Sequence, residues 1–192
     1  MPMNHLTTPF AQRLLTVAEY HRMAEAGIIK ADEQVELLAG TILPMSPIGT
    51  RHTTCVKRTN RLFSMIVGEK AIVSVHDPIL LSDTSEPEPD VALLAPPLEQ
   101  YAHRHPGPED VFLVVEVADS SLQKDRKLKL PLYAEAGIPE VWLVDLEADQ
   151  IEVYSEPQGQ QYRLRRLAQR GDQVSVAALA TEVAVVDVLG PV

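Results

Sequence analysis

The sequence contains a single cysteine, Cys55, among its 192 residues. One thiol excludes an intrachain disulfide and a zinc site built from several cysteines, and it is typical of a reducing compartment. Long apolar runs are also missing, because no stretch approaches the ~18 apolar residues of a membrane span. The first eleven residues hold two prolines and no apolar segment of signal-peptide length. We therefore expect a cytoplasmic protein that does not contact a membrane.

Positive charge is scarce as well. Seventeen Lys and Arg stand against 27 Asp and Glu, which gives a net charge of −10. This balance excludes a generally polycationic nucleic-acid binder, although local basic patches remain possible. The phosphate-binding patterns GxGxxG and GxxxxGK[ST] and the nucleophile pattern GxSxG are absent. What is present is an ordinary globular composition, 45% apolar, in a chain long enough for one domain, residues 1–192.

The order of helix and strand patterns predicts an α/β (α+β) protein with a mixed central sheet flanked by helices. A capping box at Thr16 and Glu19 begins the first helix, and Gly27 ends it. The further elements expected are a hairpin at 35–46 turning at Ala39-Gly40, helices at 52–68 and 120–136, and strands at 71–81, 90–95, 111–117, 140–146, 150–155, 161–167 and 182–188. Pro131 is an anomaly inside the second of these helices.

Glu116 is the most informative residue. It lies near the end of VFLVVEV, a run that predicts a strand covered on both faces, where a carboxylate is costly without a cation or hydrogen-bond donors. Asp90 opens the preceding short strand, and consecutive strands usually lie side by side. Two carboxylates on neighbouring strands can share Mg²⁺ or Mn²⁺. The alternative is structural: Glu116 pairs with an arginine and Asp90 caps a turn.

Three clusters contain 12 of the 17 basic residues. They are Arg51, Lys57, Arg58 and Arg61; Lys124, Arg126, Lys127 and Lys129; and Arg163, Arg165, Arg166 and Arg170. Such clusters can follow a phosphate backbone, although a solvated surface is the more common explanation. Lys129 lies four residues after Asp125, and taken alone this pair indicates only an exposed ion pair. Taken alone, Glu36 is interpreted as a surface or hairpin residue. His52, also taken alone, is interpreted as a polar residue at a helix end.

Taken together, these segments resemble the Uma-type restriction endonuclease family of the PD-(D/E)XK nuclease superfamily. The resemblance rests on an ordered set of segments covering roughly residues 16–167: VELLAGTILPMSPIGTRH (35–52), Pro89-Asp90, VVEVADSS around Glu116, DRKLK (125–129) and YAEAGIPEVWLVD (133–145).

The resemblance implies an αβββαβ core with extra β-strands at 168–192, and a Mg²⁺- or Mn²⁺-dependent DNA endonuclease. Asp90, Glu116 and the main-chain carbonyl of Val117 would bind the metal, and Glu36 would line the same pocket. The superfamily places a lysine two residues after the acid, but this chain has Ala118 there. Lys129 is then the catalytic lysine expected, with Lys127 as second choice. Residues expected to contact DNA are His52, Lys57, Arg58, Arg61 and Lys127.

Two other functions remain open at this point. The absent lysine and the acidic net charge also suit an inactive nuclease-fold module that binds DNA or protein, and a metal-dependent hydrolase of small molecules is a third possibility. Because double-strand cleavage needs two active sites and the C-terminal strands add apolar area, we also expect a homodimer.

Overall fold

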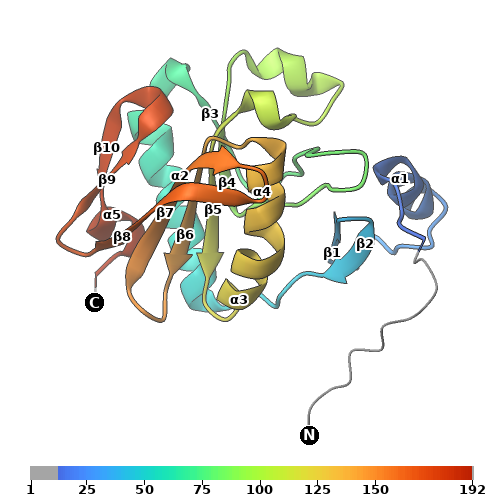
Figure 1. The fold of residues 1–192 in the computed structure, drawn as a ribbon, viewed down its shortest axis with the longest axis horizontal. Helices are drawn as coiled ribbons and strands as arrows, with labels where there is room; N and C mark the ends of the chain where they lie inside the picture. Colours follow the sequence, from blue (N-terminus) through green and yellow to red (C-terminus); the bar gives the residue numbers. More distant parts are fainter. Residues whose placement is uncertain (1–12, 192) are drawn as a thin grey trace, which may run out of the picture.

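A six-stranded mixed sheet forms the centre of the computed structural model, which describes residues 13–191 (Figure 1). Its strands, in spatial order, are β3 (Ile72–Ser74), β4 (Val91–Leu94), β5 (Val111–Ala118), β6 (Glu140–Asp145), β7 (Gln150–Gln158) and β8 (Gln161–Gln169). The remaining strands form two small hairpins, β1 (Val35–Leu38) with β2 (Thr41–Pro44), and β9 (Gln173–Val176) with β10 (Thr181–Ala184). The helices are α1 (Val17–Glu25), α2 (Thr50–Ile66), α3 (Leu122–Lys124), α4 (Leu130–Ala136) and α5 (Val185–Leu189).

The predicted αβββαβ order runs from α2 to β6. Strands β3, β4 and β5 are antiparallel neighbours, whereas β5 and β6 are parallel and are joined through α3 and α4. A parallel pair needs such a crossover, because the chain must return to the same end of the sheet. The register pairs Val91 with Val115 and Glu116 with Leu143. The expectation of a mixed sheet flanked by helices is confirmed.

Both faces of the sheet are covered, as the continuous apolar run of β5 predicted. On one face, Phe63 of α2 belongs to a buried cluster with Val115 and Trp142. On the other face, Tyr133 of α4 is in the cluster that contains Val114. Side chains alternate between faces along a strand, so Glu116 points toward α4 and not toward α2.

The local signals of the first helix and hairpin are confirmed. The Thr16 hydroxyl accepts a hydrogen bond from the Glu19 N–H at 3.2 Å, and the Glu19 carboxylate accepts one from the Thr16 N–H at 3.0 Å. Ala39 and Gly40 both have positive φ, the conformation that a tight two-residue hairpin requires. The hairpin positions Glu36, which is only 1% exposed.

The helix expected at 120–136 is divided into α3, a π-helical segment at Asp125–Lys129 and α4. Pro131 falls in the first turn of α4, where its missing N–H is tolerated. The wider π turn buries both Asp125 and Lys129, so the expectation of an exposed ion pair at these positions is wrong.

Two expected strands are shorter in the structure. The run 71–81 forms a strand only at Ile72–Ser74, because His76 has a left-handed φ of 57° and Pro78 cannot donate to a ladder. Residues 185–188 form helix α5 and not a strand. Val185, Val188 and Leu189 are buried at helical spacing, and this packing outweighs the strand preference of valine.

The C-terminal residues complete the core on the α2 side of the sheet. Val174 and Val176 of β9, a strand that the sequence analysis missed, are fully buried with Val183 and Val188 in the same cluster as Phe63. The apolar area of these residues is therefore covered within the chain, whereas Leu164 and Leu167 of β8 are 52% and 50% exposed, and the homodimer stays a prediction. Among residues 13–191, no helix has the length and apolar character needed to cross a bilayer.

Candidate active site

Asp90 and Glu116 lie beside each other at the β4–β5 junction. Asp90 directly precedes β4, and the pairing of Val91 with Val115 places it across from Glu116. The Val117 N–H donates a hydrogen bond to Asp90 Oδ2 at 2.7 Å, which fixes the carboxylate against β5. Asp90, Glu116 and Val117 line one pocket of about 50 Å³. The three residues predicted to bind metal are therefore together.

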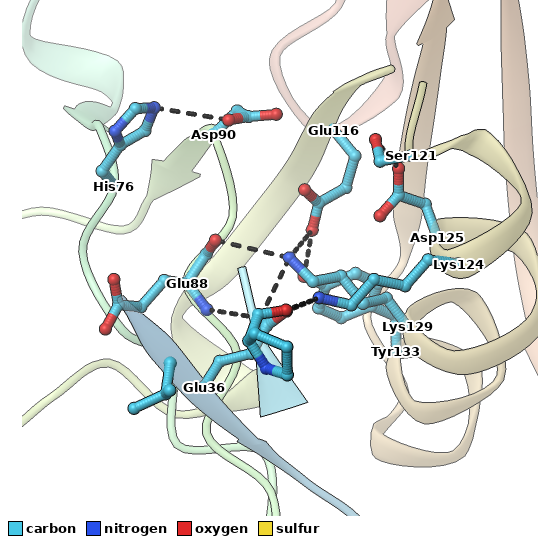
Figure 2. Close-up of polar contacts among 12 residues, drawn as sticks. Glu36, His76, Glu88, Asp90, Glu116, Ser121, Lys124, Asp125, Lys129 and Tyr133 are labelled. Atoms are coloured by element: carbon cyan, nitrogen blue, oxygen red, sulfur yellow. Dashed lines mark hydrogen bonds and ion pairs between the residues drawn. The ribbon is translucent and has the colours of Figure 1, made fainter. Parts of the chain in front are cut away.

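The ammonium of Lys129 lies at the centre of a buried polar cluster (Figure 2). Its Nζ is 3.1 Å from Glu116 Oε1 and 3.1 Å from Glu36 Oε2. It also donates to the main-chain carbonyl of Glu88 at 3.4 Å. Lys129 is therefore the lysine that contacts the acid of β5, whereas Lys127 is exposed.

Glu36 and Glu116 each have a second partner. Lys124 Nζ is 2.9 Å from Glu36 Oε1 and 2.9 Å from the carbonyl of Pro44. The Tyr133 hydroxyl donates to Glu116 Oε1 at 2.6 Å. Both contacts of Glu116 thus use the same carboxylate oxygen. Glu36 lies in the β1–β2 hairpin, as the residue pattern indicated, but it is buried in the pocket, as the family resemblance implied. The alternative in which Glu116 pairs with an arginine is wrong, because its partners are Lys129 and Tyr133.

Burial and charge shift the pKa values of this cluster in a consistent way. Burial raises the pKa of Glu116 to about 8, against the opposing effect of the Lys129 charge. Burial alone lowers the pKa of Lys129, but the carboxylates of Glu116 and Glu36 outweigh it and raise that pKa above its ordinary value. Lys129 is therefore an ammonium at neutral pH, able to donate hydrogen bonds but not to accept a proton.

Asp90 lies between two histidines. His52 Nε2 is 3.0 Å and His76 Nε2 is 3.3 Å from Asp90 Oδ1. Burial raises the pKa of Asp90, but the hydrogen bonds from His52, His76 and the Val117 N–H outweigh burial and bring it to about 2. The same bond to Asp90 raises the pKa of His76. Asp90 is thus a firmly ionised carboxylate at the mouth of the pocket.

Two more acids complete the pocket lining. The Glu88 N–H donates to Glu36 Oε2 at 3.4 Å, while its carboxylate is directed away from Lys129 (Figure 2). Asp125 accepts a hydrogen bond from Ser121 at 2.7 Å. Burial raises the pKa of both carboxyl groups. A dense group of carboxylates with shifted pKa values in one pocket is characteristic of a functional site.

Most side chains of the predicted basic clusters form hydrogen bonds or ion pairs with other residues of the chain. Arg58 donates to the carbonyls of Val188 and Leu189 at 3.2 and 2.8 Å, where it holds the end of α5. Further ion pairs within the chain join Arg51 to Asp119, Arg126 and Arg165 to Glu152, Arg163 to Glu156, and Arg170 to Asp149. Within residues 13–191, Lys57, Arg61 and Lys127 are exposed and form no ion pair.

Sequence reasoning gave no role to His76 or Tyr133. His76 comes close to Asp90 because its left-handed backbone ends the β3 segment. Tyr133 had a usable signal, since it follows Lys129 by one helical turn and opens the YAEAGIPEVWLVD segment.

Comparisons with known proteins identify the family and the fold of the chain. The model of the Uma2 family, described as "Putative restriction endonuclease", matches residues 17–188. No match is found among curated proteins. The chain is also similar to a crystal structure from Anabaena variabilis ATCC 29413 of a "putative nuclease belonging to DUF820". That likeness has a TM-score of 0.73 at 17% identity, over 91% of this chain and 97% of the other. At this identity the likeness shows the fold, and the family match over most of the chain shows that the protein belongs to the Uma2 family.

Proposed function

We propose that the protein is a Mg²⁺- or Mn²⁺-dependent DNA endonuclease that hydrolyses phosphodiester bonds. The observation that carries this proposal is the contact of Lys129 with Glu116 in the pocket that also contains Asp90. Two carboxylates from adjacent strands, with a cation beside them, form the arrangement that the family resemblance implies. Family membership supports the nuclease chemistry.

The donor set suits a hard divalent cation. Asp90, Glu116 and the Val117 carbonyl would hold it, because carboxylate and carbonyl oxygens are the ligands that Mg²⁺ and Mn²⁺ prefer. The low pKa of Asp90 keeps that ligand ionised, and the second oxygen of Glu116 is left for a cation by the contacts on Oε1. When bound, such a cation acidifies a water molecule and offsets the charge that develops on the phosphate.

The chain's own residues would then position and stabilise the reacting groups. Lys129, held as an ammonium by Glu36 and Glu116, would offset the charge that develops on the phosphate. The donor that now makes the long 3.4 Å bond to the Glu88 carbonyl would be the one that orients the attacking water. It is not the base, because its raised pKa keeps it protonated. Glu36 and Tyr133 would act on Lys129 and Glu116 by fixing their positions.

The size of the pocket argues for a polymeric substrate. About 50 Å³ has room for a cation and a few water molecules, whereas sites that enclose small molecules usually measure ~300 Å³ or more. We propose that a DNA strand lies across the mouth of the pocket, with only one phosphate reaching inward. Lys57, Arg61 and Lys127, with His52 at the pocket, are the proposed contacts to its backbone. Arg58 is not among them, because its guanidinium is occupied by carbonyl groups.

An inactive nuclease-fold module is the second candidate. The net charge of −10 and Ala118 in the usual lysine position favour it. The position of Lys129 speaks against it, since the ammonium contacts the same acid from the following helix. Calorimetry with Mg²⁺ and Mn²⁺ separates the two: absence of binding at millimolar metal would favour the inactive module.

The proposed function is tested by incubating supercoiled plasmid with protein and Mn²⁺ or Mg²⁺, with EDTA as the negative control. We expect nicked and linear products from the wild type and none from Glu116→Gln or Asp90→Asn. Glu140→Gln is the matched control, because Glu140 is also a buried strand carboxylate but contacts Trp142 and Ala177 instead. Cleavage by Glu116→Gln and Asp90→Asn at the wild-type rate would overturn the proposal.

We further propose that two copies of the chain together cut double-stranded DNA, because each copy supplies one active site and each strand needs one. Light scattering with DNA present tests this, and a protein mass that stays near the 21.2 kDa monomer would contradict it.

A further inference from the structure

A second cluster of metal-binding side chains lies outside the proposed active site. It consists of His21 on α1, Glu86 before β4, and His105 in the segment between β4 and β5. One ligand atom from each residue lies within 4.8 Å of the other two. Among residues 13–191, this is the one group of three or more His, Cys, Asp or Glu side chains that converges so closely.

Glu86 is the anchor of this cluster. Its side chain is only 3% exposed, and its N–H donates to the Leu37 carbonyl at 2.8 Å, which fixes the backbone beside β1. His21 Nε2 is 2.7 Å from Glu86 Oε2.

The other oxygen of Glu86 has no such partner. Oε1 is buried and has no hydrogen-bond partner among the described residues. An unpaired buried carboxylate oxygen is costly, and a bound ion is one of the few arrangements that satisfies it.

The positions of the two imidazoles suit a small metal ion. The ring centroids of His21 and His105 are 6.2 Å apart, with the rings edge to face. Ligand atoms around a tetrahedral ion at 2.0–2.1 Å are about 3.3 Å from one another. The three ligand atoms now lie within 4.8 Å of one another, so metal binding would require the side chains of His21 and His105 to move closer. Both side chains are on the surface, where such a rotation is open to them.

We propose that His21, Glu86 and His105 form a binding site for Zn²⁺, with water as the fourth ligand. Two imidazoles and one carboxylate favour a borderline-soft ion such as Zn²⁺, whereas the oxygen-rich active site favours Mg²⁺ or Mn²⁺. The two sites therefore take different classes of metal and are occupied independently.

The proposed Zn²⁺ site would attach α1 to the body of the protein. Helix α1 lies at the periphery (Figure 1), and Val17 is its only residue that is buried. A metal bound to His21 would connect this helix to Glu86, which precedes Glu88 and Asp90 of the active site by only a few residues, and to the loop that carries His105. We expect Zn²⁺ to raise the melting temperature, because it binds the folded chain and not the separated segments.

Calorimetry of untagged, metal-free protein titrated with Zn²⁺ tests the proposal, with millimolar Mg²⁺ present to occupy the active site. We expect one equivalent of Zn²⁺ to bind. His21→Ala and His105→Ala should each weaken that binding by about tenfold or more, because even changes to the residues around metal ligands lower metal affinity by ~10–100-fold. His103→Ala is the matched control, because His103 is exposed on the same loop but is not in the cluster. Asp90→Asn should bind Zn²⁺ as the wild type does.

Cobalt substitution supplies a second readout. Co²⁺ in a tetrahedral site absorbs visible light, so the spectrum should appear in the wild type and in Asp90→Asn but not in His21→Ala or His105→Ala. The proposal is overturned if Zn²⁺ does not bind, if only one of the two histidine variants loses it, or if Asp90→Asn abolishes it. Because Asp90→Asn removes the proposed nuclease site and keeps the Zn²⁺ site, failure of one proposal is distinguishable from failure of the other.

Discussion

Lys129 Nζ lies 3.1 Å from Glu116 Oε1, although the two residues are 13 positions apart and belong to different elements. The nuclease superfamily that the sequence resembles has a lysine on the same strand as the acid, where this chain has Ala118. Here the π-helical segment that follows β5 buries Lys129 and directs its ammonium back to the strand. We propose that the crossover helix supplies the same chemical group in this way.

Replacing Lys129 with methionine tests the importance of this contact. The change leaves Glu116 and Glu36 buried with one cation fewer, and removing one partner of a buried pair costs about 3–5 kcal/mol. We expect the low end, about 3 kcal/mol in urea unfolding, because Lys124 still pairs with Glu36 and the raised pKa of Glu116 lets that group protonate.

The Lys129→Met variant should also lose DNA cleavage by ~10²-fold or more, as when a donor to developing charge is removed. Lys70→Met is the control, since Lys70 is an exposed lysine that is neither in the pocket nor among the proposed DNA contacts. Equal effects of the two changes on cleavage would show that Lys129 has no special role.

The salt dependence of DNA binding tests the proposed backbone contacts. Each lysine or arginine that contacts a phosphate changes the slope of log K against log salt concentration by about 1. The double variant Lys57→Ala/Arg61→Ala should therefore reduce the slope by up to about 2, measured by fluorescence anisotropy across a salt series. Arg58→Ala should instead lower the melting temperature, because Arg58 caps the carbonyls of α5. An unchanged slope in the double variant would place the DNA on another face.

How far the sequence predicts this structure depends on the range of the interactions. The capping box at Thr16, the turn at Ala39-Gly40 and the helix end at residue 136 are set by neighbouring residues and were predicted. The residue after that helix, Gly137, has a φ of +83°. The covered strand 111–118 was also predicted, because its apolar run is continuous.

Features set by distant contacts were missed. His76 reaches Asp90 only through a left-handed residue in a long connection, and α5 is a helix because its valines pack on the α2 side of the sheet. Burial of Asp125 and Lys129 depends on a π turn for which the sequence holds no simple signal. For the site, the resemblance identified Glu36, Asp90, Glu116 and Lys129, whereas residue patterns alone identified only the two strand carboxylates.

The pair Arg104–Asp110 predicts how stability depends on pH. The hydrogen bonds from Arg104 lower the pKa of Asp110 below its ordinary 3.8, and the Gly107 N–H contributes in the same direction. A carboxyl with a lowered pKa in the folded state stabilises the fold above pH 3.8, and this contribution is lost as the pH falls through the lower value.

Asp110→Asn should therefore cost about 1 kcal/mol at neutral pH, a small value because Arg104 is partly exposed. The difference in melting temperature from the wild type should shrink as the pH falls below 4, followed by circular dichroism. A constant difference down to pH 2 would contradict the assignment.

The single thiol gives a simple test of packing. Cys55 is 1% exposed, and burial raises its pKa to about 11. Because the thiolate is the reactive form, the native protein should not react with a disulfide reagent at pH 8, whereas the urea-unfolded chain should react with one equivalent. Rapid labelling of the folded protein would show that α2 does not pack as described.

The most direct test of the nuclease proposal is a crystal of the protein soaked in Mn²⁺ and measured for anomalous scattering. The account predicts an anomalous peak between Asp90 and Glu116, with carboxylate oxygens of both residues and the Val117 carbonyl at roughly 2.0–2.6 Å, the range of oxygen ligands around hard divalent cations. An ordered site that shows no peak between these two carboxylates at saturating Mn²⁺ would contradict it.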